Sequence, residues 1–319
     1  MNKNIIDTLY QQLNSYRTDK SKKWKALALQ KAINSLKNYD LEIKCGNDVK
    51  DLPNVGKGIV SRINEIITTG TLADINKPPE QDIKLIEKFN EITGVGNAKA
   101  KSWIKDGYKT IEDIKKAGKD GKIKLTHHIE IGLKYYDDFK QRIPRQEIDK
   151  IDKLFGKILK KFNPKLIYQI CGSYRRGQKD SGDIDIIITD PEYDGNIQDQ
   201  KYLSSIVKLC KNKDLIIDDL TSSGEKKYMG VCRLPGYEIA RRIDIRCFNK
   251  EEYYAAVIYF TGSKNFNVLI RQKCKSKGYS LNEYGLVNIE NKELRYLQSE
   301  EELFEILEIP YLKPDERDF

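Results

Sequence analysis

The residue types best suited to chemistry lie close together in the sequence GSYRRGQKDSGDID, at residues 172–185. Side chains at positions i and i+2 of a strand point to the same face, so we expect Asp183 and Asp185 to present two carboxylates side by side. Two buried carboxylates repel each other, and a divalent cation between them removes that repulsion. Because every candidate ligand atom is an oxygen, the pattern predicts Mg²⁺ or Mn²⁺.

Groups that could hold a triphosphate surround this pair of acids. They are two hydroxyls, one guanidinium and two glycine amides, from Ser173, Ser181, Arg176, Gly172 and Gly182. A third acid, Asp244, lies among apolar neighbours in the sequence RIDIR, where a lone buried carboxylate would be costly. Three strand carboxylates beside a phosphate-binding turn predict phosphoryl transfer with two metal ions. The alternative is that these acids cap turns or pair with nearby arginines.

A short motif occurs twice in the N-terminal part, as LPNVGKG at residues 52–58 and as TGVGNA at residues 93–98. Gly56, Gly94 and Gly96 lack a Cβ atom, so the backbone can approach a phosphate while the first amides of the next helix point at it. The repeat resembles the helix-hairpin-helix DNA-binding element, although an ordinary corner between helices is the alternative. Such a contact reads no bases and weakens with salt.

The elements that must position these residues change in type near residue 166. Apolar residues at helical spacing predict two helices within 5–37, broken between Tyr16 and Lys23, and further helices at 59–67, 97–103 and 145–162. Strands are predicted at 166–171, 184–189, 237–241 and 243–247. The fold class is therefore a helical N-terminal part followed by an α+β part.

Composition and charge limit the class of protein. The 319 residues carry a net charge of +9, divided into +3 over residues 1–94, +11 over 95–180 and −5 over 181–319. A basic middle segment beside an acid-rich one indicates a surface for a polyanion, unless the lysines are merely solvated. No apolar run long enough for a membrane span occurs, and Asp7 precedes any apolar signal region. We therefore expect an intracellular protein that is neither secreted nor bound to a membrane.

The cysteines and histidines argue against two further kinds of site. Six scattered cysteines include no C-x-x-C pair, and the two histidines are adjacent, at His127 and His128. A structural zinc site and a histidine-based nucleophile are both disfavoured by this pattern. Reduced thiols are expected.

Several blocks together resemble the family X DNA polymerases, of the DNA polymerase beta type. They are residues 171–185, residues 241–246, the run YFTGSKNFN at 259–267 with Arg271, LNEY at 281–284, GLKYY at 132–136 and RIPR at 142–145. The resemblance covers nearly the whole chain. It implies a helical N-terminal domain with helix-hairpin-helix motifs, then a nucleotidyltransferase-type palm with a small α+β C-terminal subdomain.

The resemblance also implies four subdomains. Residues 1–85 correspond to a lyase-type domain that holds a 5′-phosphate, residues 86–145 to a thumb-like duplex-binding subdomain, residues 146–251 to the catalytic palm, and residues 252–319 to a nucleotide-selecting subdomain. By the same resemblance, Asp183 and Asp185 bind both metal ions, and Asp244 binds the catalytic one.

Further roles follow from matching positions. The triphosphate contacts are Arg142, Ser173, Arg176, Ser181 and Gly182; the sugar pocket is Tyr259, Phe260 and Gly262; and Asn267 reaches the incoming base. The DNA contacts are Lys25, Gly56, Gly94, Gly96, Arg242 and Arg271. The carbonyls that match Na⁺ or K⁺ sites against DNA phosphates are those of Leu52, Val55, Ile92 and Val95.

Two positions depart from the family pattern. Lys264 stands where the family often has aspartate, near the incoming base, so nucleotide affinity is expected to differ. Arg62 stands at the position of the lysine that forms the Schiff base in the lyase reaction. A guanidinium stays protonated and is no nucleophile, so we expect weak lyase chemistry.

The resulting prediction is a template-directed, gap-filling DNA polymerase of base excision repair. It would use two divalent ions, dNTPs and gapped or nicked duplex DNA with a 5′-phosphate. We expect a monomer located in the nucleus or wherever its DNA substrate resides. A template-independent nucleotidyltransferase is the alternative enzyme, because the G-S…D-x-D core is common to both. A nonenzymatic gap-binding scaffold is the alternative from a different class.

Overall fold

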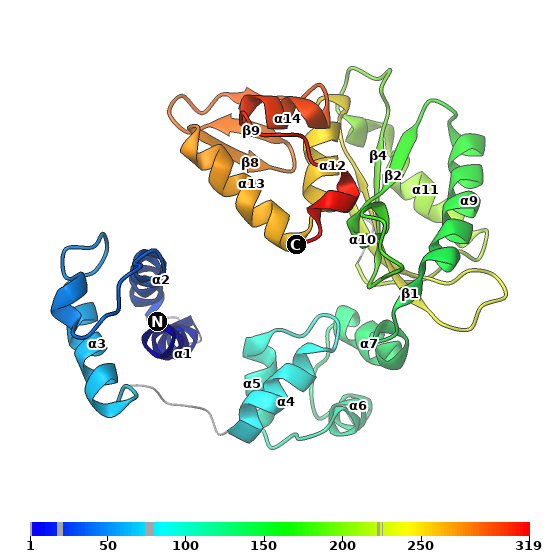
Figure 1. The fold of residues 1–319 in the computed structure, drawn as a ribbon. Coiled ribbons are helices and arrows are strands. Elements are labelled where there is room, and N and C mark those ends of the chain that lie inside the picture. Colours follow the sequence, from blue (N-terminus) through cyan, green and yellow to red (C-terminus); the bar gives the residue numbers. More distant parts are fainter. Residues whose placement is uncertain (1, 18–21, 74–79, 222–223, 225) are drawn as a thin grey trace. The chain divides into compact units, whose positions relative to one another are not determined.

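The computed structural model describes residues 2–17, 22–73, 80–221, 224 and 226–319. The chain divides into two compact units, drawn in Figure 1. The first comprises residues 1–91 and 95–123, and the second comprises residues 92–94 and 124–319. In the described residues, no helix is both long and apolar enough to cross a membrane.

The described elements of the first unit are all helical, as predicted. They are α1 (Lys3–Arg17), α2 (Lys23–Lys37), the 3-10 helix η2 (Gly46–Val49), α3 (Lys57–Thr69), α4 (Glu80–Asn90), α5 (Asn97–Lys105) and α6 (Ile111–Lys119). Apolar residues of α1, α2 and α3, among them Leu9, Leu29 and Ile63, share one buried cluster. Gly70 ends α3 with a φ of +74°, and its amide donates to the Ile66 carbonyl.

The break between the first two helices is shorter than predicted at both described edges. Tyr16 is buried inside α1, and Lys23 already belongs to α2. The polar neighbours of Tyr16 predict that it belongs to the break, but its ring packs with the apolar face of α1. Residues 18–21, in the middle of the predicted break, lie outside the described residues.

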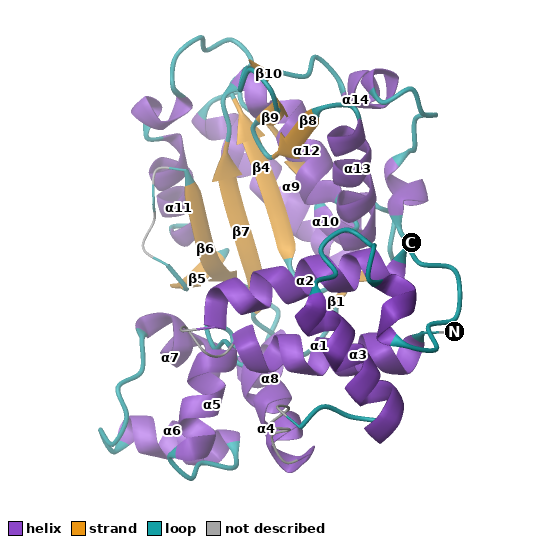
Figure 2. Ribbon diagram, turned by 90° about the vertical axis from the view of Figure 1, so that its left-hand side faces the viewer, coloured by secondary structure: helices purple, strands orange, loops and turns teal. Residues whose placement is uncertain are grey.

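The second unit contains a five-stranded sheet in the order β2-β4-β7-β6-β5 (Figure 2). Its strands are β2 (Ile167–Ile170), β4 (Ile184–Thr189), β5 (Ile216–Asp219), β6 (Lys227–Cys232) and β7 (Arg241–Cys247). The β4–β7 pair is parallel, and the other pairs are antiparallel. A separate short pair joins β1 (Ile143–Pro144) to β3 (Asp180–Ser181).

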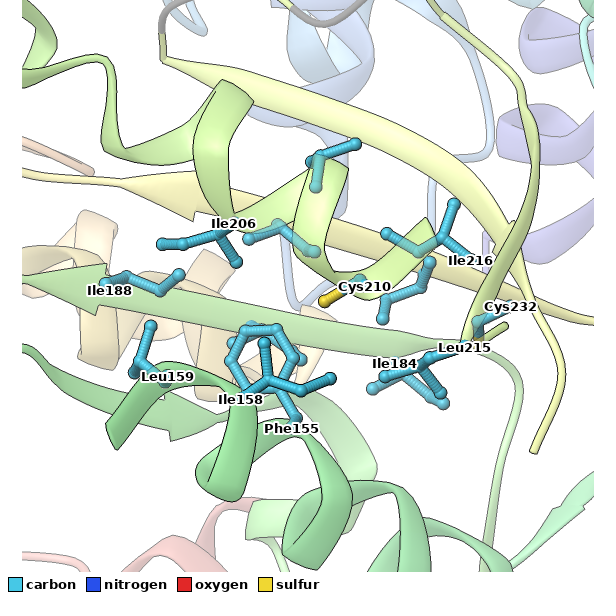
Figure 3. Packing of buried hydrophobic residues seen from close by; sticks show 14 of the residues in the cluster. Phe155, Ile158, Leu159, Ile184, Ile188, Ile206, Cys210, Leu215, Ile216 and Cys232 are labelled. Carbon is cyan, nitrogen blue, oxygen red and sulfur yellow. The ribbon is translucent and has the colours of Figure 1, made fainter. Parts of the chain in front are cut away.

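Helices α9 (Arg145–Phe162) and α11 (Tyr202–Lys211) supply the apolar side chains that pack on one face of this sheet. Figure 3 shows Phe155, Ile158 and Leu159 of α9 near Ile184 and Ile188 of β4. Because strand side chains alternate, Asp185 and Ile187 of β4 point to the opposite face. The packing of α9 and α11 therefore decides which face of the sheet carries the aspartates.

The remaining elements of the second unit include short helices and a small antiparallel sheet. They are α7 (His127–Lys134), α8 (Tyr136–Phe139), α10 (Gly172–Arg175), η3 (Ile197–Gln200), η4 (Lys250–Glu252), α12 (Tyr253–Thr261), α13 (Lys264–Ser276), β8 (Tyr279–Asn282), β9 (Gly285–Asn288), β10 (Leu294–Arg295), α14 (Glu300–Ile306) and η5 (Pro314–Arg317). Ile258, Phe266, Leu286 and Phe304 share one buried cluster among these elements. The expected small α+β C-terminal part is therefore present.

The strand predicted at 237–241 is wrong except for its last residue. Leu234 and Tyr237 close a turn, and the Ala240 amide donates to the Asp138 carboxylate rather than to a neighbouring strand. Strand β7 begins at Arg241. The prediction also missed β5 and β6, which complete the sheet on the far side of β7.

Three ion pairs, around the buried carboxylates of Glu147 and Glu300, join these elements. Arg241 at the start of β7 donates twice to Glu147 of α9, at 2.9 and 2.8 Å, and both side chains are buried. Arg175 of α10 and Arg317 of η5 both donate to Glu300 of α14. All six cysteines are free, and all but Cys45 are buried.

Candidate active site

Two of the three predicted catalytic acids lie directly opposite each other. Asp185 on β4 and Asp244 on β7 are register partners in the parallel pair. Each is flanked on its strand by isoleucines that belong to the core, so both carboxylates are on the face away from α9 and α11. On that same face, Ile187 of β4 packs with Ala256 and Val257 of α12.

The electrostatics of this pair depart strongly from those of exposed acids. Burial, and then the negative charges of Asp183 and Asp244, raise the pKa of Asp185 from 3.8 to about 7. Burial is also the largest cause that raises the pKa of Asp244, and the charge of Asp183 adds to it. Among the described residues, no lysine or arginine forms an ion pair with Asp185 or Asp244. The negative charge of the pair is therefore poorly compensated by the protein itself.

Asp183 is near these two acids but is already paired. The Arg242 guanidinium donates to its carboxylate at 2.9 Å, and both side chains are partly exposed. In the part of the chain that the structure describes, no three acidic, cysteine or histidine side chains are arranged to hold a metal ion. The chemistry of the three acids fits a divalent cation, provided that Asp183 turns away from Arg242.

A pocket of about 400 Å³ opens beside the acids. It is lined by Asp183, Asp185 and all the predicted nucleotide-binding residues except Ser181. Ser181 is buried, and its hydroxyl accepts a hydrogen bond from that of Ser173 at 2.8 Å. The fold thus brings predicted residues from three separate segments, around 142, 172–185 and 259–267, to one pocket.

Two glycines shape the walls of this pocket. Gly172 has a φ of +60°, and a Cβ atom there would lie 3.1 Å from the Asp185 carboxylate. Gly262 has a φ of +65°, and a Cβ atom there would lie 3.4 Å from a terminal nitrogen of Arg176. The peptide bond that follows Gly262 is cis. Each glycine therefore permits a left-handed backbone conformation, and Gly172 also permits a close approach to Asp185 that a larger residue would obstruct.

Arg142 reaches the pocket through a strand pairing. Ile143 pairs with Ser181, which places Arg142 beside the turn that contains Gly182. The Nε of Arg142 donates to the Asp180 carboxylate at 2.8 Å, and one terminal nitrogen donates to the Asp180 carbonyl at 3.2 Å. The guanidinium is exposed enough to meet a ligand, because 58% of the side chain is accessible.

The aromatic side of the pocket is held by polar and cationic contacts. The Asn267 amide donates to the Tyr259 carbonyl at 2.8 Å. The Arg271 guanidinium lies over the Tyr259 ring at 4.9 Å, and that of Arg246 lies over the Phe260 ring at 4.5 Å. These contacts fix the wall that would face a nucleoside.

Sequence reasoning missed several residues of the site. Thr261 and Ser263, which were missed, line the pocket beside Lys264, which was expected near the incoming base. The charges of Lys227 and Arg246 lower the pKa of Asp244, against the larger effect of its burial. A signal for Arg246 was available, since it lies two residues beyond Asp244 on the same strand and so on the same face. Lys227 could not be found in this way, because it lies on the missed strand β6 and pairs with Arg246 there.

The two predicted hairpins are present, each between two helices. Gly56 and Gly96 are the N-cap residues of α3 and α5. Gly94 has a φ of +91°, and a Cβ atom there would lie 3.2 Å from the His128 ring. Nothing lies within 4 Å of a Cβ atom built on Gly56 or Gly96, so both helix starts have open space in front of them.

The residues predicted to offer carbonyls to monovalent ions lie in these hairpin turns. Val55, Ile92 and Val95 are buried, and Leu52 is partly buried. The Leu52 carbonyl accepts a hydrogen bond from the Val55 amide at 3.1 Å, which closes the first turn.

Arg62 is engaged within its own domain. One terminal nitrogen donates to the Gly58 carbonyl at 3.0 Å, and the other donates to the Tyr16 hydroxyl at 3.2 Å. Lys57 opens the same helix, and Lys25 is exposed on α2. The guanidinium is therefore held as a hydrogen-bond donor, while Lys57 and Lys25 are among the amines of the same helical domain.

Comparisons with known proteins agree with this architecture. Family models match the DNA polymerase beta palm at residues 142–250, the DNA polymerase beta thumb at 256–318, the fingers domain of DNA polymerase lambda at 87–140 and a helix-hairpin-helix domain at 1–72. The name "thumb" thus goes to the C-terminal segment, whereas the sequence analysis gave it to residues 86–145.

Curated relatives cover nearly the whole chain. It is 35% identical to DNA polymerase lambda of Rattus norvegicus over 93% of its length and 32% identical to DNA polymerase lambda of Arabidopsis thaliana over 99%. It is also 26% identical to DNA nucleotidylexotransferase of Xenopus laevis over 92%. The chain spans 53%, 62% and 64% of these three proteins, respectively.

The fold and the site define a class of protein, in which a polymerase palm with aspartates on adjacent strands follows helix-hairpin-helix elements. The family follows from the matched models and the two lambda relatives. The chain belongs to the family X DNA polymerases.

Proposed function

We propose that the chain is a template-directed, gap-filling DNA polymerase of base excision repair. It would transfer dNMP from a dNTP to a primer 3′-hydroxyl and release pyrophosphate. The observation that carries this proposal is the register pair of Asp185 and Asp244 beside a pocket lined by Arg142, Arg176 and glycine amides. Such a site places incompletely compensated negative charge next to groups that bind a triphosphate.

Family X DNA polymerases use divalent metal ions, and we propose two here, as Mg²⁺ or Mn²⁺, held by Asp183, Asp185 and Asp244. Bound ions would lower the pKa of the primer hydroxyl and stabilise the leaving pyrophosphate. The raised pKa of Asp185 supports this assignment, because its main causes are burial and two neighbouring carboxylates. Arg242 would then be released from Asp183 to contact DNA.

The remaining pocket residues would bind and orient the nucleotide. Arg142 and Arg176, with Ser173, Ser181 and the Gly172 and Gly182 amides, would hold the triphosphate. Tyr259, Phe260 and Gly262 would line the sugar, and Asn267 would reach the incoming base. Arg271 would contact the template strand from its position over Tyr259.

The helical part would hold the DNA. The open helix starts at Gly56 and Gly96, with the turn at Gly94, suit contacts to phosphates that do not depend on sequence. The turn carbonyls at Leu52, Val55, Ile92 and Val95 would accept Na⁺ or K⁺ against those phosphates. Lys25 would contact a 5′-phosphate in a gapped or nicked duplex.

The subdomain limits remain part of this proposal. Residues 1–85 would bind the 5′-phosphate side of a gap, and residues 86–145 would bind the duplex. Residues 146–251 would catalyse nucleotidyl transfer, and residues 252–319 would select the nucleotide. The matched segments at 1–72, 87–140, 142–250 and 256–318 support a division close to these limits. We propose a monomer that acts wherever its DNA substrate resides, such as the nucleus.

Single-nucleotide incorporation tests the proposal against its two alternatives. The substrate is a gapped duplex with a 5′-phosphate, offered with each of the four templating bases, in Mg²⁺ and in EDTA. We expect the complementary nucleotide to be added in Mg²⁺ and nothing in EDTA. Equal addition without a template would favour a template-independent nucleotidyltransferase, which the relative from Xenopus laevis keeps as the second candidate. Gap binding without any addition would favour a scaffold.

A further inference from the structure

The segment that follows α14 reaches back to the nucleotide pocket through Asp318. The Nε of Arg176 donates to one carboxylate oxygen of Asp318 at 3.1 Å. The Gln178 side-chain amide donates to the other oxygen. Arg176 and Gln178 follow directly after α10, about 140 residues earlier in the chain, so this contact joins segments that are far apart in sequence.

Asp318 is held in place from the inside of the fold. Arg317, next to it, is fully buried and donates to the Leu312 carbonyl at 2.9 Å and to Glu300 at 2.7 Å. The Arg317 carbonyl accepts from the Ser263 amide at 3.2 Å. The backbone at Asp318 is therefore anchored through Arg317, by its buried guanidinium and by the bond of its carbonyl to Ser263 in the bend that lines the pocket.

The contacts of Arg176 decide which of its donors stay available. Its Nε is used by Asp318, and one terminal nitrogen donates to the Thr261 carbonyl at 2.7 Å. A guanidinium has five N–H donors, so two fixed bonds leave three, all on the two terminal nitrogens. Donors on the terminal edge, between these two nitrogens, suit phosphate oxygens. The Arg176 side chain is only 14% exposed, so it has little freedom to turn elsewhere.

From this geometry we infer that Asp318, oriented by Gln178, is a positioning residue for Arg176 and sets the affinity of the pocket for the nucleotide triphosphate. The inference rests on the proposed function, because it assigns the ligand of Arg176 to a triphosphate. Asp318 binds Arg176 at the Nε side and so fixes the plane of the guanidinium without taking its terminal edge. A fixed plane lowers the entropy that is lost when the phosphate binds.

The test compares dNTP affinity and maximal rate in single-turnover gap filling. Asp318→Ala removes both acceptors, and Asp318→Asn removes the charge while keeping the shape. We expect the apparent dNTP dissociation constant to rise about five-fold in Asp318→Ala, with a smaller rise in Asp318→Asn. The maximal rate, the affinity for gapped DNA and the melting temperature should stay at the wild-type values. Asp315→Asn is the matched control, because it changes the same charge in the same exposed segment.

A double-mutant cycle separates positioning from general structural support. In the Arg176→Ala background, Asp318→Ala should have no further effect on dNTP affinity, because there is no guanidinium left to position. An equal loss in both backgrounds would overturn the inference, as would wild-type dNTP affinity in Asp318→Ala. Tighter dNTP binding in Asp318→Ala would also overturn it, since Asp318 would then compete with the triphosphate. Absence of incorporation by the wild type would instead refute the proposed function.

Discussion

At the scale of single residues, the site keeps a destabilising carboxylate in place. The pKa of Asp185 is raised from 3.8 to about 7, mainly by burial and by two neighbouring acids. The folded, metal-free protein therefore holds this proton more tightly than the unfolded chain. Stability falls as pH rises from about 4 to about 7, and the loss is complete above that range.

Asp185→Asn should remove this cost. In EDTA at pH 8 we expect the variant to unfold with a free energy higher than that of the wild type by on the order of a few kcal/mol. At pH 4 the difference should disappear, because the wild-type carboxyl is then protonated. Urea unfolding at both pH values measures it, and Asp315→Asn controls for the loss of an exposed charge. Equal stabilities at pH 8 would show that Asp185 carries no such penalty.

Arg62 sets the expectation for lyase chemistry. A guanidinium cannot attack the sugar aldehyde of a 5′-deoxyribose phosphate, so borohydride should trap little covalent adduct on an incised abasic site. Arg62→Lys should give more adduct, because a lysine there would supply an amine. Strong trapping by the wild type would show that another amine, such as Lys57 or Lys25, performs the chemistry. Adduct yields are normalised to the amount of bound DNA, so weaker binding of the incised DNA by Arg62→Lys does not alter the comparison of the two proteins.

At the scale of elements, the contact between α9 and β7 depends on a buried pair. Glu147 and Arg241 are 5% and 4% exposed, and two hydrogen bonds join them. Glu147→Ala would leave a buried guanidinium charge without its partner and should cost about 3–5 kcal/mol of unfolding free energy. The double variant Glu147→Leu with Arg241→Met should lose less than the single variant, because no charge remains unpaired. Denaturant unfolding measures these free energies. A free energy of unfolding of Glu147→Ala within about 1 kcal/mol of the wild-type value would contradict this role of the ion pair.

The same scale shows what a sequence can and cannot predict. The sequence Ile-Asp-Ile at 184–186 and at 243–245, within runs of apolar residues, predicted both the strands and the face that carries the acids. Strands β5 and β6 were missed because their polar and glycine positions give no clear alternation. Asp183 pairs with Arg242, 59 positions away, and Arg176 pairs with Asp318, 142 positions away. A local sequence pattern cannot predict contacts between residues so far apart in the chain.

At the scale of the whole molecule, affinity for DNA should depend on salt and on the 5′-phosphate. Log affinity for gapped duplex DNA should fall linearly with log salt, because backbone and lysine contacts displace counterions. Lys25→Glu should weaken binding to phosphorylated gaps more than to unphosphorylated ones. Lys31→Glu, which reverses an exposed charge on the same helix, is the control. Titrations on both substrates check this, and equal losses with Lys25→Glu would refute its placement near the phosphate.

The central claim is that the acids on β4 and β7 perform nucleotidyl transfer. The most direct measurement is the single-turnover rate of nucleotide addition to a gapped duplex by Asp244→Asn and by the wild type, each with its DNA affinity. We expect the variant to retain DNA binding and to lose more than about a hundred-fold in rate, since each 1.4 kcal/mol of barrier is about tenfold. A variant that retained more than about a hundredth of the wild-type rate would contradict the assignment of Asp244 to the reaction.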